Sequence, residues 1–244
     1  MSEEQKIKPL EVQKLIYGKG ETKRGITSVL DAVISSYHYT SLAELNAALK
    51  QFNVVADRGK EDGRIYKAKG LVYRMLDEKG KKIGVPIKAS CIYSKPTLSN
   101  LEKYFALNEA KRELHTTRVQ KVIDEVLSNK AFSIKELMSS LSDKGIYTVL
   151  RQNEEGRIYG ITFVDNVTKS VFNGSDLGKG YSAAAIQSKL ATDTDAKMEN
   201  TTIPEHTTAN QINNLPKETL LGKHQQVNGV KDNNGKEEKV LLPF

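Results

Sequence analysis

The sequence has little from which a disulfide-linked or metal-stabilised protein is built. Its 244 residues include one cysteine, Cys91, and no tryptophan. A lone cysteine excludes a framework of internal disulfides and argues against a structural zinc site. The four histidines form neither His-x-His nor His-Glu-x-x-His, so we expect no bound metal and no other cofactor.

Long apolar runs are also missing. No stretch approaches the roughly 18 residues that a membrane-spanning helix needs. The first residues, Met-Ser-Glu-Glu-Gln-Lys, lack the apolar core of a signal peptide. We therefore expect a cytoplasmic protein that has no membrane partner.

Catalytic motifs are scarce as well. The sequence has no Gly-x-x-x-x-Gly-Lys-Ser/Thr loop, and the glycine-rich stretch 174–180 lacks that spacing. We interpret this stretch as a turn into a helix, although its backbone N–H groups could hold a phosphate. Cys91 has no histidine close by in the sequence, so we interpret it as a small buried hydrophobic residue. No catalytic residue is predicted.

What the sequence does contain is an internal similarity between two segments about ninety residues apart. A Ser-x-x-x-Leu-x-x-x-Leu motif begins at Ser41 and again at Ser133. The offset falls from 92 residues there to 90 at Gly70 and Gly160, and to 85 further on. An offset that only shrinks, at polar stretches, is expected where surface loops of a duplicated unit have been shortened.

A second alignment of the two segments is possible. The tetrapeptide Gly-Arg-Ile-Tyr occurs at 63–66 and at 156–159, an offset of 93 that puts Gly70 out of register with Gly160. We prefer the register set by these two glycines, because it keeps Tyr73 in step with Phe163 and also aligns the following aspartates. The shared tetrapeptide is then a coincidence or a shifted copy.

Each copy predicts a helix, three short strands and a second helix. Ser41 and Ser133 are each followed three residues later by glutamate, the capping box that opens an amphipathic helix. Runs rich in β-branched and aromatic residues follow, separated by turn residues, which indicates antiparallel strands. Pro86 lacks the N–H that a central strand needs, so its strand is predicted to lie at an edge.

The predicted fold class is therefore α+β: two tandem, duplicated helix–three-strand–helix modules with small antiparallel sheets, followed by a disordered tail. We assign residues 1–37 to a lead-in and helix, 38–107 to the first module, 108–130 to a connecting helix, 131–190 to the second module and 191–244 to the tail. The tail is polar, without helix or strand periodicity, and has no aromatic residue before Phe244. It cannot bury enough apolar surface to offset the entropy of ordering.

The net charge of +7 is concentrated in the first module and its flanks. Lys and Arg outnumber Asp and Glu by 24 to 16 in residues 1–130, but only by 7 to 6 in residues 131–190. These cations could neutralise phosphates, and Tyr66, Tyr73 and Tyr93 among them could stack on unpaired bases. The alternative is a solvated sheet face with half-buried tyrosines. The candidate nucleic-acid-binding residues are Arg58, Arg64, Lys67, Lys69, Arg74, Lys82, Lys88 and Lys95, and in the second module Arg151, Arg157, Lys169 and Lys179.

Strand alternation limits how many of these cations can meet one ligand. Lys82 and Lys88 share a strand face, as do Arg64 and Arg74 if they lie on continuous strands. We therefore expect contacts to four or five phosphates.

Several segments resemble a known family. They are Leu45-Asn-x-x-Leu-x-Gln-Phe-Asn-Val-x-Ala-Asp-Arg-Gly59, Gly70-Leu-Val-Tyr-x-x-Leu-Asp-Glu-x-Gly80, Gly84-Val-Pro-Ile-Lys-Ala-Ser90, Lys95-Pro-Thr-Leu98, Leu150-Arg-Gln-Asn153, Gly156-Arg-Ile-Tyr-Gly-Ile-Thr-Phe163 and Phe172-Asn-Gly-Ser-x-Leu-Gly-Lys179. Together they are similar to the region downstream of the nuclease domain in relaxases, the mobilisation nucleases of bacterial conjugative and mobilisable elements.

The resemblance implies a role in DNA mobilisation without the cutting step. Relaxases nick DNA with a tyrosine nucleophile and a metal held by a histidine cluster, both in an N-terminal domain that this resemblance does not cover. None of the ten tyrosines matches that nucleophile, so we expect a noncatalytic portion that binds transfer-origin DNA. The alternatives are a protein-interaction module that docks a relaxase or an accessory mobilisation factor, and a truncated relaxase remnant.

Overall fold

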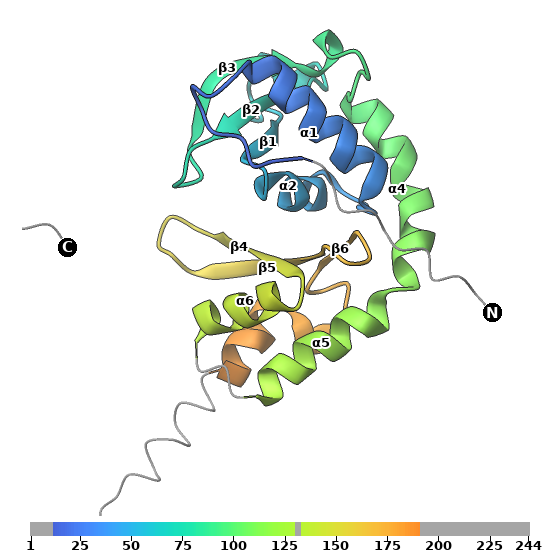
Figure 1. Cartoon of the computed structure of the whole chain (residues 1–244), viewed down its shortest axis with the longest axis vertical. Helices are drawn as coiled ribbons and strands as arrows, with labels where there is room; N and C mark the ends of the chain where they lie inside the picture. The colour runs from blue at the N-terminus through green and yellow to red at the C-terminus, as the bar shows by residue number, and fades with distance from the viewer. Residues whose placement is uncertain (1–11, 130–132, 191–244) are drawn as a thin grey trace, which may run out of the picture. The chain divides into compact units, whose positions relative to one another are not determined.

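The fold is α+β, as predicted. The computed structural model describes residues 12–129 and 133–190, and the predicted tail at 191–244 lies outside the described residues. Within the described residues the chain forms two three-stranded antiparallel sheets, with strand orders β1-β2-β3 and β4-β5-β6, accompanied by helices (Figure 1).

The elements follow the predicted order, with one helix added between the first two strands. The first part of the chain contains α1 (Thr22–Ser36), α2 (Leu42–Lys50), β1 (Val54–Asp57), α3 (Arg64–Lys67), β2 (Val72–Leu76), β3 (Lys82–Lys88), η1 (Ala89–Cys91) and α4 (Leu98–Glu113). The second contains α5 (Thr116–Ser128), α6 (Ile134–Asp143), β4 (Ile146–Gln152), β5 (Ile158–Asp165), β6 (Ser170–Asn173), η2 (Lys179–Tyr181) and a helix over 183–190. Helix α4 runs through the module boundary predicted at 107–108, so the closing and connecting helices are continuous there.

Both predicted helix starts are confirmed. The Ser41 hydroxyl accepts a hydrogen bond from the Glu44 N–H at the start of α2, and the Ser133 hydroxyl accepts one from the Glu136 N–H at the start of α6, each at 3.2 Å. These bonds satisfy N–H groups that the first helical turn leaves without a partner.

The two sheets have the same pattern of strand pairing, and the alignment that relates them is the one set by Gly70 and Gly160. Strand β1 pairs with β2 from Val54–Met75 to Asp57–Val72, and β4 pairs with β5 through Ile146–Asp165, Tyr147–Val164, Thr148–Phe163 and Val149–Thr162. Adding 92 to each β1 number and 90 to each β2 number converts the first set of pairs into the second. The glycine register therefore reproduces the hydrogen-bonding pattern, whereas the offset of 93 does not. That the two modules arose by duplication stays a prediction.

The strand containing Pro86 lies at an edge, as predicted. Strand β3 pairs only with β2, and its register shifts where residues 83–87 face residues 73–75 of β2. Because an edge strand leaves one row of backbone groups unpaired, a residue without an N–H is tolerated in it.

The two sheets are buried to different extents. The first core lies between α1, α2 and one face of the first sheet, and includes Leu30, Leu45 and Tyr73. Phe163 and neighbouring residues of the second sheet pack with α5 and α6, but Val164 and Val171, on its other face, belong to the first core. Helix α2 therefore contacts both modules, and the second sheet is covered on both faces (Figure 1).

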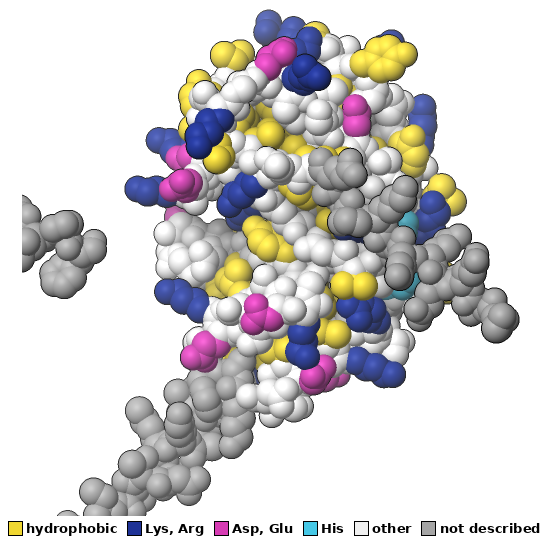
Figure 2. All heavy atoms as spheres, viewed as in Figure 1, with side chains coloured by type: hydrophobic (Ala, Val, Ile, Leu, Met, Phe, Trp, Pro, Cys, Tyr) yellow, Lys and Arg dark blue, Asp and Glu magenta, His cyan; other side chains and the backbone are white. Residues whose placement is uncertain are grey.

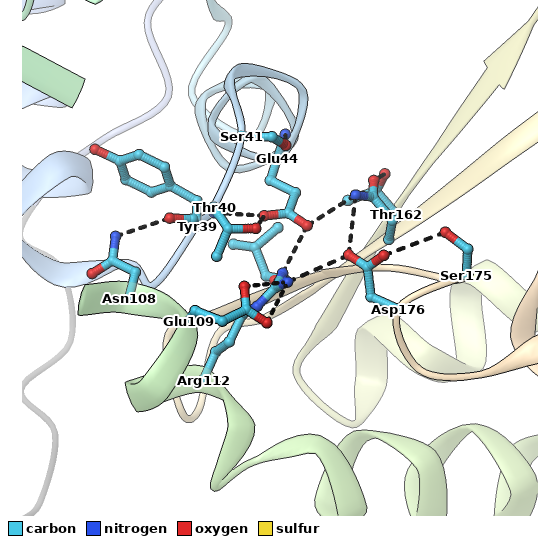
Figure 3. A network of polar contacts seen from close by, with 12 residues as sticks. Tyr39, Thr40, Ser41, Glu44, Asn108, Glu109, Arg112, Thr162, Ser175 and Asp176 are labelled. Carbon is cyan, nitrogen blue, oxygen red and sulfur yellow. Dashed lines mark hydrogen bonds and ion pairs between the residues drawn. The ribbon is translucent and has the colours of Figure 1, made fainter. Parts of the chain in front are cut away.

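A buried ion pair connects the modules. The Arg112 guanidinium in α4 lies 2.7 Å from the Glu44 carboxylate, and their side chains are 6% and 0% exposed. The same guanidinium donates to the backbone carbonyl of Val171 in β6, and the Asn173 amide of β6 donates to Glu44 at 2.9 Å. Figure 3 shows these contacts converging where α2, α4 and β6 meet.

The Glu44 carboxylate has a hydrogen-bond donor at each of its four acceptor positions. One oxygen accepts from Arg112 and Asn173, and the other from the backbone N–H and the hydroxyl of Thr40. Burial raises the pKa of Glu44, and the Thr40 hydrogen bonds and the Arg112 charge oppose that rise. A proton on either oxygen would displace one of these donors.

We predict that Arg112→Met lowers the free energy of unfolding by about 3–5 kcal/mol, because it leaves the Glu44 charge buried without its partner. Lys144→Met is a matched control, because the Lys144–Glu125 pair has the same 2.7 Å separation but lies at the surface. It should change stability by less than about 1 kcal/mol. Urea denaturation measures both, and equal losses would show that burial does not determine the strength of the Glu44 pair.

Candidate nucleic-acid interface

The outer face of the first sheet carries part of the predicted basic set. Tyr73 and Met75 of β2 point into the core, so Arg74 between them points outward. Lys82 and Lys88 pair with Leu76 and Val72, which lie on the same side of β2 as Arg74. The prediction that Lys82 and Lys88 share a face is confirmed.

An acidic side chain occupies the same face. Asp57 lies 2.8 Å from the Lys82 ammonium and 3.7 Å from the Arg74 guanidinium. Partial burial acts to raise the pKa of Asp57, but the hydrogen bonds from Lys82 and the Gly59 N–H, with the nearby positive charges, hold it below its ordinary value. Because these two cations already have a counter-charge, they attract a phosphate less strongly than the sequence suggested.

Three further cations lie between β1 and β2. Arg64 and Lys67 are exposed on α3, and the exposed Lys69 follows it. The condition under which Arg64 would share a strand face with Arg74 is not met, because residues 63–68 close a short helical turn through the bonds Lys67 N–H to Gly63 O and Ala68 N–H to Arg64 O.

The predicted aromatic residues differ in accessibility. Tyr73 is fully buried and donates its hydroxyl to the Pro96 carbonyl at 2.7 Å, so the prediction that it stacks on a base is wrong. The Arg58 guanidinium lies over the Tyr66 ring, 4.0 Å from the ring centroid. The cation therefore covers one face of the ring, and the ring covers one face of the guanidinium. Tyr93 is fully exposed.

The second module offers fewer accessible cations. Lys169 is only 8% exposed, with its ammonium 5.1 Å from the centroid of the Tyr37 ring, and burial lowers its pKa. Its burial argues against the predicted phosphate contact. Arg151 is half-buried and donates to the Asn173 side chain at 3.2 Å, whereas Arg157 and Lys179 are exposed.

Two smaller interpretations are also resolved. The glycine-rich stretch is a turn, since the Gly174 N–H donates to Ile161 O and the Gly178 N–H to Ser175 O, which engages both N–H groups. Cys91 is exposed on η1, so the prediction that it is a buried hydrophobic residue is wrong. It follows the edge strand β3 and lies at a surface hollow.

The basic residues do not form one continuous patch on the face seen in Figure 2, where Lys and Arg side chains alternate with Asp and Glu. Lys95 instead lies beside Lys23 of α1 and Lys103 and Tyr104 of α4, at two neighbouring hollows. The sequence did not single out Lys23, Lys103 or Tyr104. Lys103 and Tyr104 are adjacent in the sequence, but no local pattern connects α4 to Lys23.

Within residues 12–129 and 133–190, no three His, Cys, Asp or Glu side chains come together in a way that could hold a metal ion. In the same part of the chain, no helix combines the length and the apolar character needed to cross a membrane. Comparison of the chain with protein-family models, curated proteins and solved structures found no match.

On the hypothesis that this face contacts DNA, we predict that Asp57→Asn strengthens the binding, because it frees Arg74 and Lys82 for phosphates. With two added contacts, the slope of log K against log salt should steepen by about 1 to 2. Fluorescence anisotropy with a labelled 30-mer duplex measures this. Asp62→Asn removes the same charge from an exposed residue that forms no ion pair with the described residues. Equal effects of the two variants would indicate a response to net charge alone.

Proposed function

We propose that the chain is a noncatalytic, DNA-binding portion of a mobilisation protein. In this proposal it acts in the cytoplasm on DNA around a transfer origin, as its resemblance to relaxases implies. One observation carries the proposal: a set of exposed cations in the first module forms no ion pair with any described residue. They are Arg64, Lys67, Lys69, Lys88 and Lys95.

Exposed, unpaired cations suit a polyanionic ligand. Each phosphate that a lysine or arginine neutralises releases condensed counterions, which favours binding without any base contact. The set lies on α3, on β3 and on the loops next to them. The second module offers fewer accessible candidates, because Lys169 is buried and Arg151 is half-buried. The first module is therefore the proposed site of DNA contact.

The tyrosines support the noncatalytic part of the proposal. Tyrosine attack on a phosphodiester is favoured when the phenol loses its proton readily. Burial raises the pKa of Tyr37 to about 12 and raises those of Tyr39, Tyr73 and Tyr147. Burial and the Asp124 carboxylate raise the pKa of Tyr181 to about 12. These five are poor candidates for a nucleophile.

A second candidate function is docking of a relaxase or an accessory mobilisation factor. It is favoured by two large apolar side chains at the surface of α4 and its C-cap. Leu107 and Leu114 are 55% and 81% exposed, and they lie seven residues apart, on one face of the helix. The affinity for a partner that buries this apolar face would depend little on salt concentration.

We predict that log K for DNA falls with log salt at a slope of about −3 to −4, as expected for four or five phosphate contacts. Lys67→Glu with Lys69→Glu should flatten this slope by about 1.5, because two contacts are lost. Lys121→Glu with Lys135→Glu, at exposed residues of α5 and α6, gives the same change in net charge and should leave the slope unaltered. A wild-type slope near zero would discard DNA binding in favour of protein docking.

We also predict no DNA nicking. Purified chain incubated with Mg²⁺ or Mn²⁺ and a supercoiled plasmid carrying the transfer origin of its own element should leave the plasmid supercoiled. The measurement is an agarose gel, with denaturing electrophoresis to detect protein attached to DNA. A covalent tyrosyl–DNA adduct would contradict the noncatalytic proposal and identify the nucleophile.

A further inference from the structure

Two neighbouring hollows lie beside α1. One, of about 770 Å³, lies between α1 and the first turns of α4, and is lined by Asp31, Asn100 and Tyr104 among others. The other, of about 790 Å³, is more open and lies between the start of α1 and η1, where Lys23 and Tyr93 line it. Lys95 lines both, so the two hollows adjoin.

Aromatic side chains are accessible at both hollows. The Tyr93 side chain is fully exposed and forms no hydrogen bond with the described residues, while Tyr104 is 47% exposed. A large aromatic ring left in water is a ready platform for another flat apolar group. Because every nucleobase has a π-face, such a ring can bind bases with little sequence preference.

Cations surround these rings. Lys23, Lys95 and Lys103 line the hollows, and none of them forms an ion pair with a described residue. The Lys103 ammonium instead contacts the neutral Asn100 side chain at 3.0 Å. Asp31 is the one acidic residue that lines either hollow. The local charge is therefore positive, as a phosphate backbone requires.

The central lysine is held by its backbone. Lys95 has a left-handed φ of +44°, and its carbonyl accepts hydrogen bonds from the Thr97 N–H and the Asn100 side chain. Its own N–H donates to Ile92 O. The segment that presents this side chain to both hollows is therefore fixed before a ligand arrives, which reduces the entropy lost on binding.

We propose that these hollows form a site for single-stranded nucleic acid, in which an unpaired base stacks on Tyr93 and the flanking phosphates contact Lys23, Lys95 and Lys103. A duplex keeps its bases stacked on one another, so this geometry selects an unpaired strand. The site deepens the proposed function, on which it rests, but shares only Lys95 with the cations proposed above to contact DNA.

The single cysteine of the chain provides a direct measurement. Cys91 is exposed and lines the open hollow beside Tyr93. Alkylation of the full chain by a maleimide therefore reports whether this hollow is occupied, and no other thiol contributes to the signal. Saturating oligo(dT) of ten nucleotides should slow alkylation several-fold, whereas a blunt duplex of two complementary strands at equal nucleotide concentration should slow it much less.

Variants separate stacking from charge. Tyr93→Ala should weaken oligo(dT) binding about 5- to 100-fold, the range expected when one base–aromatic stack is lost. Tyr159→Ala is the matched control, because Tyr159 is also exposed, at 64%, but lies on β5 of the second module. This control variant should leave the affinity for oligo(dT) and the protection of Cys91 from alkylation unchanged.

Each outcome has a distinct meaning. Salt-dependent duplex binding without protection of Cys91, or equal affinities for the two tyrosine variants, would overturn this site and leave the proposed function standing. Protection by oligo(dT) that persists in the Lys67→Glu, Lys69→Glu variant would support this site even if the duplex contacts proposed above fail. Equal protection by inorganic phosphate would show that the hollow binds small anions and would overturn the stacking proposal.

Discussion

The packing of one module on the other depends on the buried ion pair between Glu44 and Arg112. Glu44 occupies the first turn of α2, where its carboxylate accepts from Thr40 just before the helix. The same carboxylate binds Arg112 of α4, which also donates to the backbone of β6. Removing two charges from water is costly, and the cost is offset only when every remaining donor and acceptor is satisfied. The pair therefore favours one arrangement of α2, α4 and β6.

That arrangement determines which basic residues remain accessible. With α2 packed on the second sheet, Val164 and Val171 enter the first core, and Lys169 is buried against the Tyr37 ring. On the outer side of the first sheet, Lys82 and Lys88 are exposed and Arg74 is half-buried. Asp57 then neutralises part of that face through Lys82 and Arg74. The surface available to a polyanion is thus smaller than a count of lysines and arginines suggests.

Local patterns in the sequence were sufficient to predict the fold class, both serine caps, the edge position of the Pro86 strand and the strand register of the repeat. Each of these depends on residues a few positions apart or on strands that follow one another. The errors concern contacts between distant parts of the chain. Alternation placed Tyr73 on a strand but could not show that its hydroxyl reaches Pro96. Likewise, nothing near Lys169 in the sequence indicates the Tyr37 ring that covers it. Lys23 was overlooked because it meets Lys95 only when α1 packs beside the loop before α4.

Two of the accessible cations have an uncommon backbone conformation. Among residues 12–129 and 133–190, four non-glycine residues have positive φ, and two of them, Lys69 and Lys95, are exposed lysines of the proposed DNA-contacting set. A side chain in the left-handed region is disfavoured, and glycine adopts that conformation without the steric cost. Both turns are hydrogen-bonded, through the Lys69 N–H to Tyr66 O and the Thr97 N–H to Lys95 O. The buried Lys169 has the same conformation, with a φ of +57°, so a positive φ here follows from the tight turns and does not by itself indicate a ligand. What distinguishes Lys69 and Lys95 is their exposure, because each side chain leaves a hydrogen-bonded turn toward solvent.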